Sequence, residues 1–175
     1  MKKTLLVLAA VAALTAAACS RKPSEPTLEF ATVGFILHLP DAMQSALDAA
    51  APGFKSINPT VFRSGVAQDA AASGGSMQAA FATVGDFDGD GSKDVIVEGA
   101  EPHDSALHVI AIMNGVKPHA FEVMSFPLYD ADAVGVYLVQ PTSAAKGTFE
   151  VVDDPDSTTI YTFKDGQFSG KKIGS

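Results

Sequence analysis

The chain has 175 residues, with 20 Asp and Glu against 12 Lys and Arg, so its formal net charge is -8. Such an acidic surface disfavours nucleic acid and anionic lipid headgroups as partners, because both are themselves negatively charged. The length is sufficient for one domain with a substantial hydrophobic core.

Residues 1–18 have the composition of a secretory signal peptide. Lys2 and Lys3 precede an apolar run, residues 4–14, which is too short to remain as a membrane span. Small residues then lead to Cys19, the single cysteine of the chain. The polar, proline-containing residues 19–27 are typical of a tether, and residues 28–175 are expected to form one domain.

The sequence Ala16-Ala17-Ala18-Cys19 resembles a bacterial lipobox. The resemblance implies cleavage before Cys19 and acylation of its thiol, which would attach the protein to a membrane. Ser20, by the same resemblance, implies sorting to the outer membrane. The alternative is ordinary cleavage after Ala18, which would leave a free thiol of a kind that is unusual in an exported protein.

One helix is predicted over residues 41–51. Asp41 follows a proline and is a suitable N-cap, Gln44 completes a capping-box pattern, and Pro52-Gly53 ends the run. An apolar stripe at helical spacing predicts that one face of this helix packs on a sheet. Its members are Met43, Ala46, Leu47 and Ala50. Residues 65–72 are also compatible with a helix.

Residues 86–94 have the spacing of a calcium loop. Carboxylates stand at loop positions 1, 3, 5 and 9, and a glycine stands at position 6, where such loops turn sharply. The predicted ligands are the side chains of Asp86, Asp88 and Asp90, the backbone carbonyl of Ser92, and Asp94 directly or through a water. The alternative is an acidic turn that binds nothing.

The loop departs from an EF-hand. Position 12 is Val97 instead of a bidentate Glu, and a β-branched run beginning at Val95 predicts a strand where the EF-hand has a helix. The unit of strand, loop and strand resembles the calcium loops of FG-GAP (integrin-type) and VCBS repeats over about fifteen residues. That resemblance implies that Phe87 anchors the loop in the core. The motif occurs once, which excludes a propeller of such repeats.

The second half of the chain is rich in predicted strands separated by turn signals. Expected strands are 80–84, 95–97, 107–113, 120–126, 135–139, 148–152 and 159–163, with a hairpin turn at Asp165-Gly166. The predicted fold class is α+β: an antiparallel β-meander with the N-terminal helix packed on one face and the calcium loop between two strands. The sequences Val84-Gly85-Asp86-Phe87 and Thr159–Phe168 also resemble small exported proteins of proteobacteria that carry a single calcium-type motif.

Other catalytic constellations are weak. His103 and His108 are not at a metal-ligand spacing, His38 and His119 are isolated, and no Gly-x-Ser-x-Gly elbow is present. The expected function is therefore that of a lipid-anchored envelope protein that binds one structural Ca²⁺ and acts as a binding or interaction module, with a possible protein partner. The alternatives are a purely structural envelope lipoprotein, or a small periplasmic hydrolase that uses Glu98, Glu101 and Asp104.

Overall fold

The computed structural model describes residues 24–31, 34–57, 81–127, 138–141, 147–154 and 157–173. These residues form antiparallel β-sheets and one short helix, which confirms the α+β class predicted from the sequence. The helix is α1 (Asp41–Ala50), and the strands are β1 (Thr27–Ala31), β2 (Gly34–His38), β3 (Lys55–Ser56), β4 (Ala82–Gly85), β5 (Asp94–Ala100), β6 (Ala106–Met113), β7 (His119–Pro127), β8 (Leu138–Pro141), β9 (Thr148–Asp154), β10 (Ser157–Lys164) and β11 (Gln167–Ile173).

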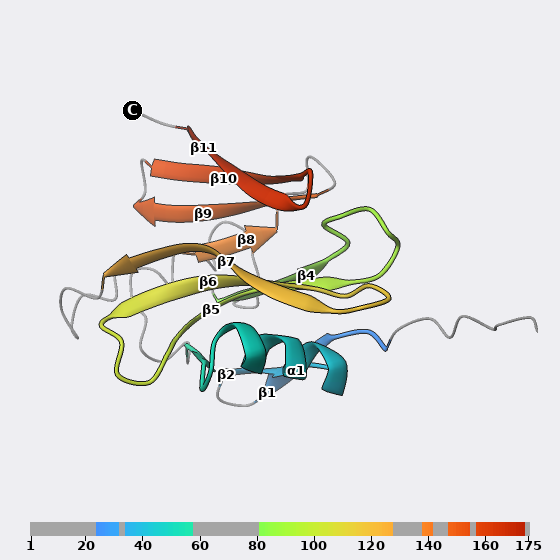
Figure 1. The fold of residues 1–175 in the computed structure, drawn as a ribbon. Coiled ribbons are helices and arrows are strands. Elements are labelled where there is room, and N and C mark those ends of the chain that lie inside the picture. The colour runs from blue at the N-terminus through green and yellow to red at the C-terminus, as the bar shows by residue number, and fades with distance from the viewer. Residues whose placement is uncertain are drawn as a thin grey trace, which may run out of the picture.

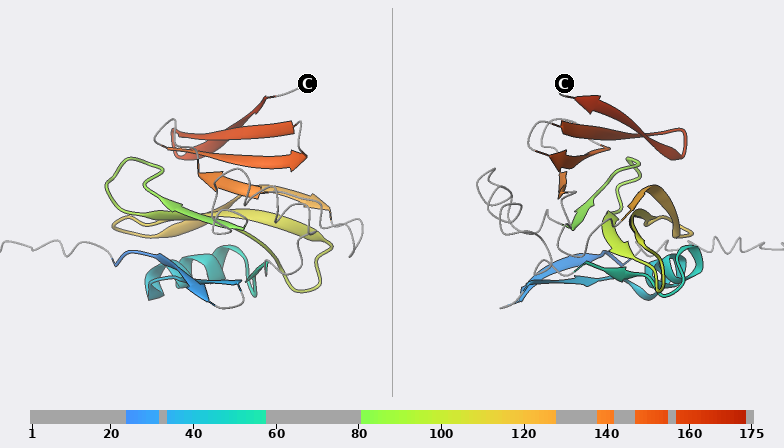
Figure 2. Two further views of the ribbon diagram at one scale, coloured as in Figure 1. Left: turned by 180° about the vertical axis from the view of Figure 1, so that it is seen from behind. Right: turned by 90° about the vertical axis from the view of Figure 1, so that its left-hand side faces the viewer.

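The strands divide between three sheets, a partition that the sequence pattern does not reveal. β1 and β2 form a two-stranded sheet, β8 to β11 form a four-stranded sheet, and β3, β5, β6 and β7 form a sheet in which β4 also pairs with β5. Figures 1 and 2 show these units as layers, with the β5–β7 sheet between the β8–β11 sheet above and α1 with the β1–β2 hairpin below.

The central sheet is buried on both faces, which explains the continuous apolar runs of β5 and β6. Val95 and Val97 belong to a core shared with Met43 and Leu47 of α1. Ile96 faces the opposite way into a second core that includes Phe149 of β9. Because successive side chains of a strand point to opposite faces, each β-branched residue of β5 fills one core or the other. Each such burial contributes about 1.5–3 kcal/mol.

α1 begins at Asp41, so the prediction that Asp41 is the N-cap is wrong. The N-cap is Pro40, no side chain caps the helix, and the Gln44 amide donates instead to Asp48 at 2.8 Å. The capping box therefore does not form. Met43 and Leu47 of the predicted stripe are buried, whereas Ala50 is exposed.

Three strands were not predicted, namely β1, β2 and the short β3. β1 and β2 pair from Thr27 with His38 to Ala31 with Gly34, and β3 pairs with the end of β5. Among the predicted strands, 107–113 and 120–126 correspond to β6 and β7. The described residues do not include the expected signal peptide, Cys19, the possible helix at 65–72 or most of the strand expected at 135–139.

Candidate metal centre

The loop at residues 86–93 is closed by the pairing of β4 with β5. The two strands are antiparallel, and Gly85 pairs with Asp94 at the base of the loop. Phe87 is buried in the second core, where its ring makes edge contacts with Phe149 and Phe168 at centroid distances of 6.1 Å each. The loop is therefore attached to the core through one aromatic side chain, as the resemblance to FG-GAP loops implied.

Three of the expected ligands converge. Asp86, Asp88 and Asp94 each offer a carboxylate oxygen, and these oxygens lie within 4.8 Å of one another. Calcium binds protein oxygens at about 2.3–2.6 Å, so two ligand atoms on one ion are separated by up to about twice that distance. The three carboxylates could therefore hold one metal ion.

Hydrogen bonds from the loop backbone hold the Asp86 and Asp88 carboxylates in place. Asp86 accepts hydrogen bonds from the backbone N–H of Gly89 at 2.8 Å and of Gly91 at 3.1 Å. Asp88 accepts from the N–H of Asp90 at 2.9 Å. Gly89 and Gly91 have φ of 83° and 87°, a left-handed conformation that glycine adopts without strain. The acidic residues thus form the turn as well as the candidate site.

Asp94 connects the 86–93 loop to the β6–β7 turn. Its side chain is fully buried, and its two oxygens accept hydrogen bonds from the N–H of Phe87 at 2.8 Å and of Asn114 at 2.7 Å. Burial raises the pKa of Asp94 to about 6, and the Asp88 charge also raises it, although backbone hydrogen bonds from Asn114, Phe87 and Asp88 act in the opposite direction. A bound cation would favour the ionised carboxylate and offset the cost of its burial.

Of the two remaining predicted ligands, Asp90 is exposed and Ser92 is buried. Asp90 is not part of the group of three converging carboxylates, and one of its oxygens accepts the N–H of Ser92 at 2.7 Å. Its other oxygen lies close to Gly115, so that a Cβ added there would be 3.4 Å away. Asp90 therefore fastens the loop and faces the β6–β7 turn.

Sequence reasoning missed the contacts of the N-terminal segment with this loop. The Glu25 carboxylate accepts the backbone N–H of Lys93 at 3.0 Å, and the Ser24 carbonyl accepts the Asn114 side-chain amide at 3.1 Å. Asn114 is 1% exposed. The dipeptide Asn114-Gly115 carried only a turn signal in the sequence, and nothing in it indicated a partner about 90 residues earlier in the chain.

Two of the acidic residues considered for a hydrolase, Glu98 and Asp104, have different surroundings. Glu98 is fully buried, and both of its carboxyl oxygens lack a hydrogen-bond partner. Burial raises its pKa well above 4.5. Asp104 instead accepts from His108 Nε2 at 3.0 Å, while Glu122 lies 2.6 Å from His108 Nδ1. Among the described residues, the carboxylates with metal-ligand spacing are those of the 86–94 loop.

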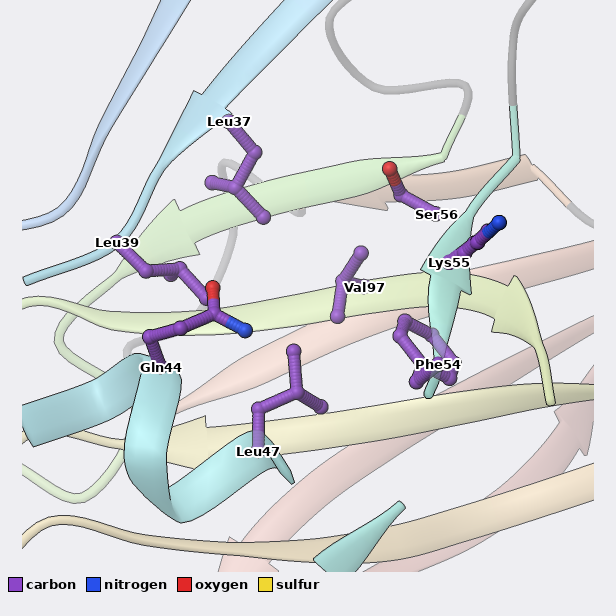
Figure 3. Close-up of a pocket in the computed structure, with 8 residues that line it drawn as sticks. All are labelled: Leu37, Leu39, Gln44, Leu47, Phe54, Lys55, Ser56 and Val97. Carbon is purple, nitrogen blue, oxygen red and sulfur yellow. The ribbon is translucent and has the colours of Figure 1, made fainter. Parts of the chain in front are cut away.

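A pocket of about 270 Å³ lies on the other face of β5, between β2, α1 and β3 (Figure 3). Its described lining is Leu37, Leu39, Gln44, Leu47, Phe54, Lys55, Ser56 and Val97. The Lys55 side chain extends away from Val97 at the centre of the view. Since Val97 and Asp94 stand an odd number of residues apart in the strand, the pocket and the carboxylate of Asp94 are on opposite faces of the sheet.

Comparison with protein-family models, with curated proteins and with solved structures finds no match. In the part of the chain that the structure describes, no helix has the length and hydrophobicity needed to cross a membrane.

Proposed function

We propose that this protein is a lipid-anchored envelope protein whose 86–94 loop binds one structural Ca²⁺ and presents a rigid surface to a binding partner. The observation that carries the proposal is the convergence of the Asp86, Asp88 and Asp94 carboxylates within 4.8 Å. Without a cation, these charges repel one another at short range, and one of them is buried. A divalent ion converts that repulsion into attraction.

The ion would stabilise the domain by bridging segments that come together only in the folded state. Asp86 and Asp88 belong to the loop, whereas Asp94 begins β5 and is hydrogen-bonded to the β6–β7 turn. A site assembled only in the native chain adds its binding free energy to folding. The exposed side of the loop would then offer a rigid surface to a binding partner.

The test is thermal unfolding of residues 20–175 with EGTA and with millimolar Ca²⁺, together with calorimetric titration of Ca²⁺. We expect a calcium-dependent rise in Tm that Asp88→Asn abolishes. Asp165→Asn, in the exposed turn between β10 and β11, is the matched control and should retain the rise. An unchanged Tm in the parent protein, with no heat of binding, would show that the loop is an acidic turn.

The lipid anchor is proposed from Cys19 and the small residues that precede it. Export with outer-membrane sorting would place the domain in a compartment where calcium is accessible. The mass of the mature N-terminus, measured on protein from membranes, should include acyl chains. Cys19→Ala should release the protein into the soluble envelope fraction. A mature N-terminus with an unmodified thiol would instead support ordinary signal-peptide cleavage.

A further inference from the structure

The N-terminal end of the described chain is held at the end of the domain that carries the 86–94 loop. Ser24 and Glu25 are hydrogen-bonded to Asn114 and Lys93, and Pro26 is buried. In Figure 1 and in the left view of Figure 2, this blue end of the chain, the β4–β5 loop and the β6–β7 turn lie together at one end of the central sheet. We call the surface formed by residues 86–93 and 114–118 the loop face.

The distance between this surface and Cys19 is limited by the chain. Cys19 precedes Ser24 by five residues, and an extended chain spans at most about 3.6 Å per residue, so its α-carbon lies within about 18 Å of that of Ser24. The β5–β6 turn lies at the opposite end of β5 in both views. β5 has seven residues at about 3.3 Å each. The β5–β6 turn is therefore about 20 Å farther from Ser24 than the loop face is.

We infer that the loop face is turned toward the lipid bilayer. This inference rests on the proposed acylation of Cys19, which brings the membrane surface to within reach of Ser24. Because Ser24 is hydrogen-bonded to Asn114, a short tether cannot easily present the opposite end of the domain to the membrane. The occupant of the loop face is therefore a lipid surface, and the β5–β6 turn is left facing away from it.

The residues at the tip of the β6–β7 turn are suited to contact with a lipid surface. Val116 is fully exposed, which is unusual for a large aliphatic side chain in an otherwise well-packed sheet, and the neighbouring Lys117 is also exposed. An aliphatic side chain next to an ammonium group fits the boundary between acyl chains and phosphate headgroups. The described residues cover neither of these two side chains.

The charge of the loop face makes this approach sensitive to calcium and to the lipid. Asp86, Asp88 and Asp90 are exposed there, and together they would repel anionic headgroups. A bound Ca²⁺ would remove most of that repulsion. The loop face should therefore approach neutral vesicles with or without calcium, and anionic vesicles more closely when calcium is present.

The experiment uses the full mature lipoprotein in vesicles of phosphatidylethanolamine and phosphatidylcholine that contain an acceptor-labelled lipid. A donor dye is attached to Lys117→Cys or, as the matched control at the other end of the sheet, to Ser105→Cys. Acylated Cys19 does not react with the dye. We expect higher energy transfer from position 117 than from position 105. Phosphatidylglycerol added to the vesicles should lower the transfer from position 117, and Ca²⁺ should restore it.

Two further variants separate orientation from folding. A flexible Gly-Ser insertion between Ser20 and Arg21 lengthens the tether without altering any described contact, and it should reduce the difference between the two dye positions. Glu25→Ala, which removes the bond to Lys93, should reduce it as well. Equal or reversed energy transfer from the two positions would overturn the inferred orientation while leaving the anchor intact. Failure of the parent protein to associate with vesicles would overturn both the anchor and the orientation.

Discussion

The two ends of β5 differ in the groups that surround their carboxylates. At the loop end, the Asp86, Asp88 and Asp94 carboxylates converge within 4.8 Å of one another. At the other end, Asp104 and Glu122 bracket His108, and Glu98 is buried with no hydrogen-bond partner. At the second end, an imidazole interacts with the two carboxylates and burial raises the pKa of Glu98, whereas at the loop end we propose that an ion from solution balances the charge.

The largest effect is expected from Asp94→Ala. The change leaves the N–H groups of Phe87 and Asn114 without their buried acceptor and also removes a ligand of the proposed ion. Loss of two buried hydrogen bonds to a carboxylate should lower the free energy of unfolding by about 3–5 kcal/mol. Urea unfolding in EGTA measures the part that is independent of calcium. A decrease of less than about 1 kcal/mol in the free energy of unfolding in EGTA would contradict the proposal that Asp94 connects the loop to the β6–β7 turn.

Asp88→Asn should abolish the stabilisation by calcium while leaving the calcium-free protein nearly unchanged, because Asp88 is exposed and an amide oxygen can still accept the Asp90 N–H. For a ligand at one hundred times its Kd, the lost stabilisation is about 2.7 kcal/mol. Urea midpoints with EGTA and with calcium measure this difference. The idea that the loop end requires an ion fails if the variant and the parent respond equally to calcium.

Glu98→Gln should change how stability depends on pH. Burial raises the folded-state pKa of Glu98 above the unfolded value near 4.5. The contribution of the protonated Glu98 to folding stability is therefore fully present below pH 4.5 and is lost as pH rises through the folded-state pKa. The parent should therefore lose stability relative to the variant as pH increases, by about 1–3 kcal/mol at most. Calcium is kept saturating in both, so that the Asp94 carboxylate remains ionised. Parallel stability curves for the two proteins would show that Glu98 does not bind an extra proton on folding.

The smallest effect is expected at His108. Burial alone would lower its pKa, but the hydrogen bonds and charges of Glu122 and Asp104 raise it, and the net pKa is above 6.5. The imidazolium therefore contributes stability that is fully present below the unfolded pKa of 6.5 and is lost as pH rises through the folded pKa. His108→Gln should cost about 1 kcal/mol more near pH 6 than near pH 9, since both carboxylates are partly exposed. Urea unfolding of both proteins at the two pH values measures this difference. An equal loss of stability at both pH values would indicate that His108 stabilises the fold through packing alone.

The sequence determined the candidate site because its ligands are close in the chain. Alternate aspartates with glycines at fixed offsets specify a tight turn locally, and the structure brings Asp86, Asp88 and Asp94 together at the residues that the spacing indicated. The β-branched runs of β5 and β6 were recognisable for the same reason, since strand formation depends on short-range alternation and shape. The lipobox resemblance is likewise local, and it lies outside the described residues.

Contacts between residues far apart in the chain could not be predicted from local patterns. The division of the strands into three sheets, the burial of Glu98 and the bracketing of His108 depend on pairings between segments far apart in the chain. The contact of Ser24 with Asn114 is of the same kind. Turn and ligand spacing is encoded over a few residues, whereas sheet order and side-chain burial emerge from the free energy of the whole core, which no local pattern specifies.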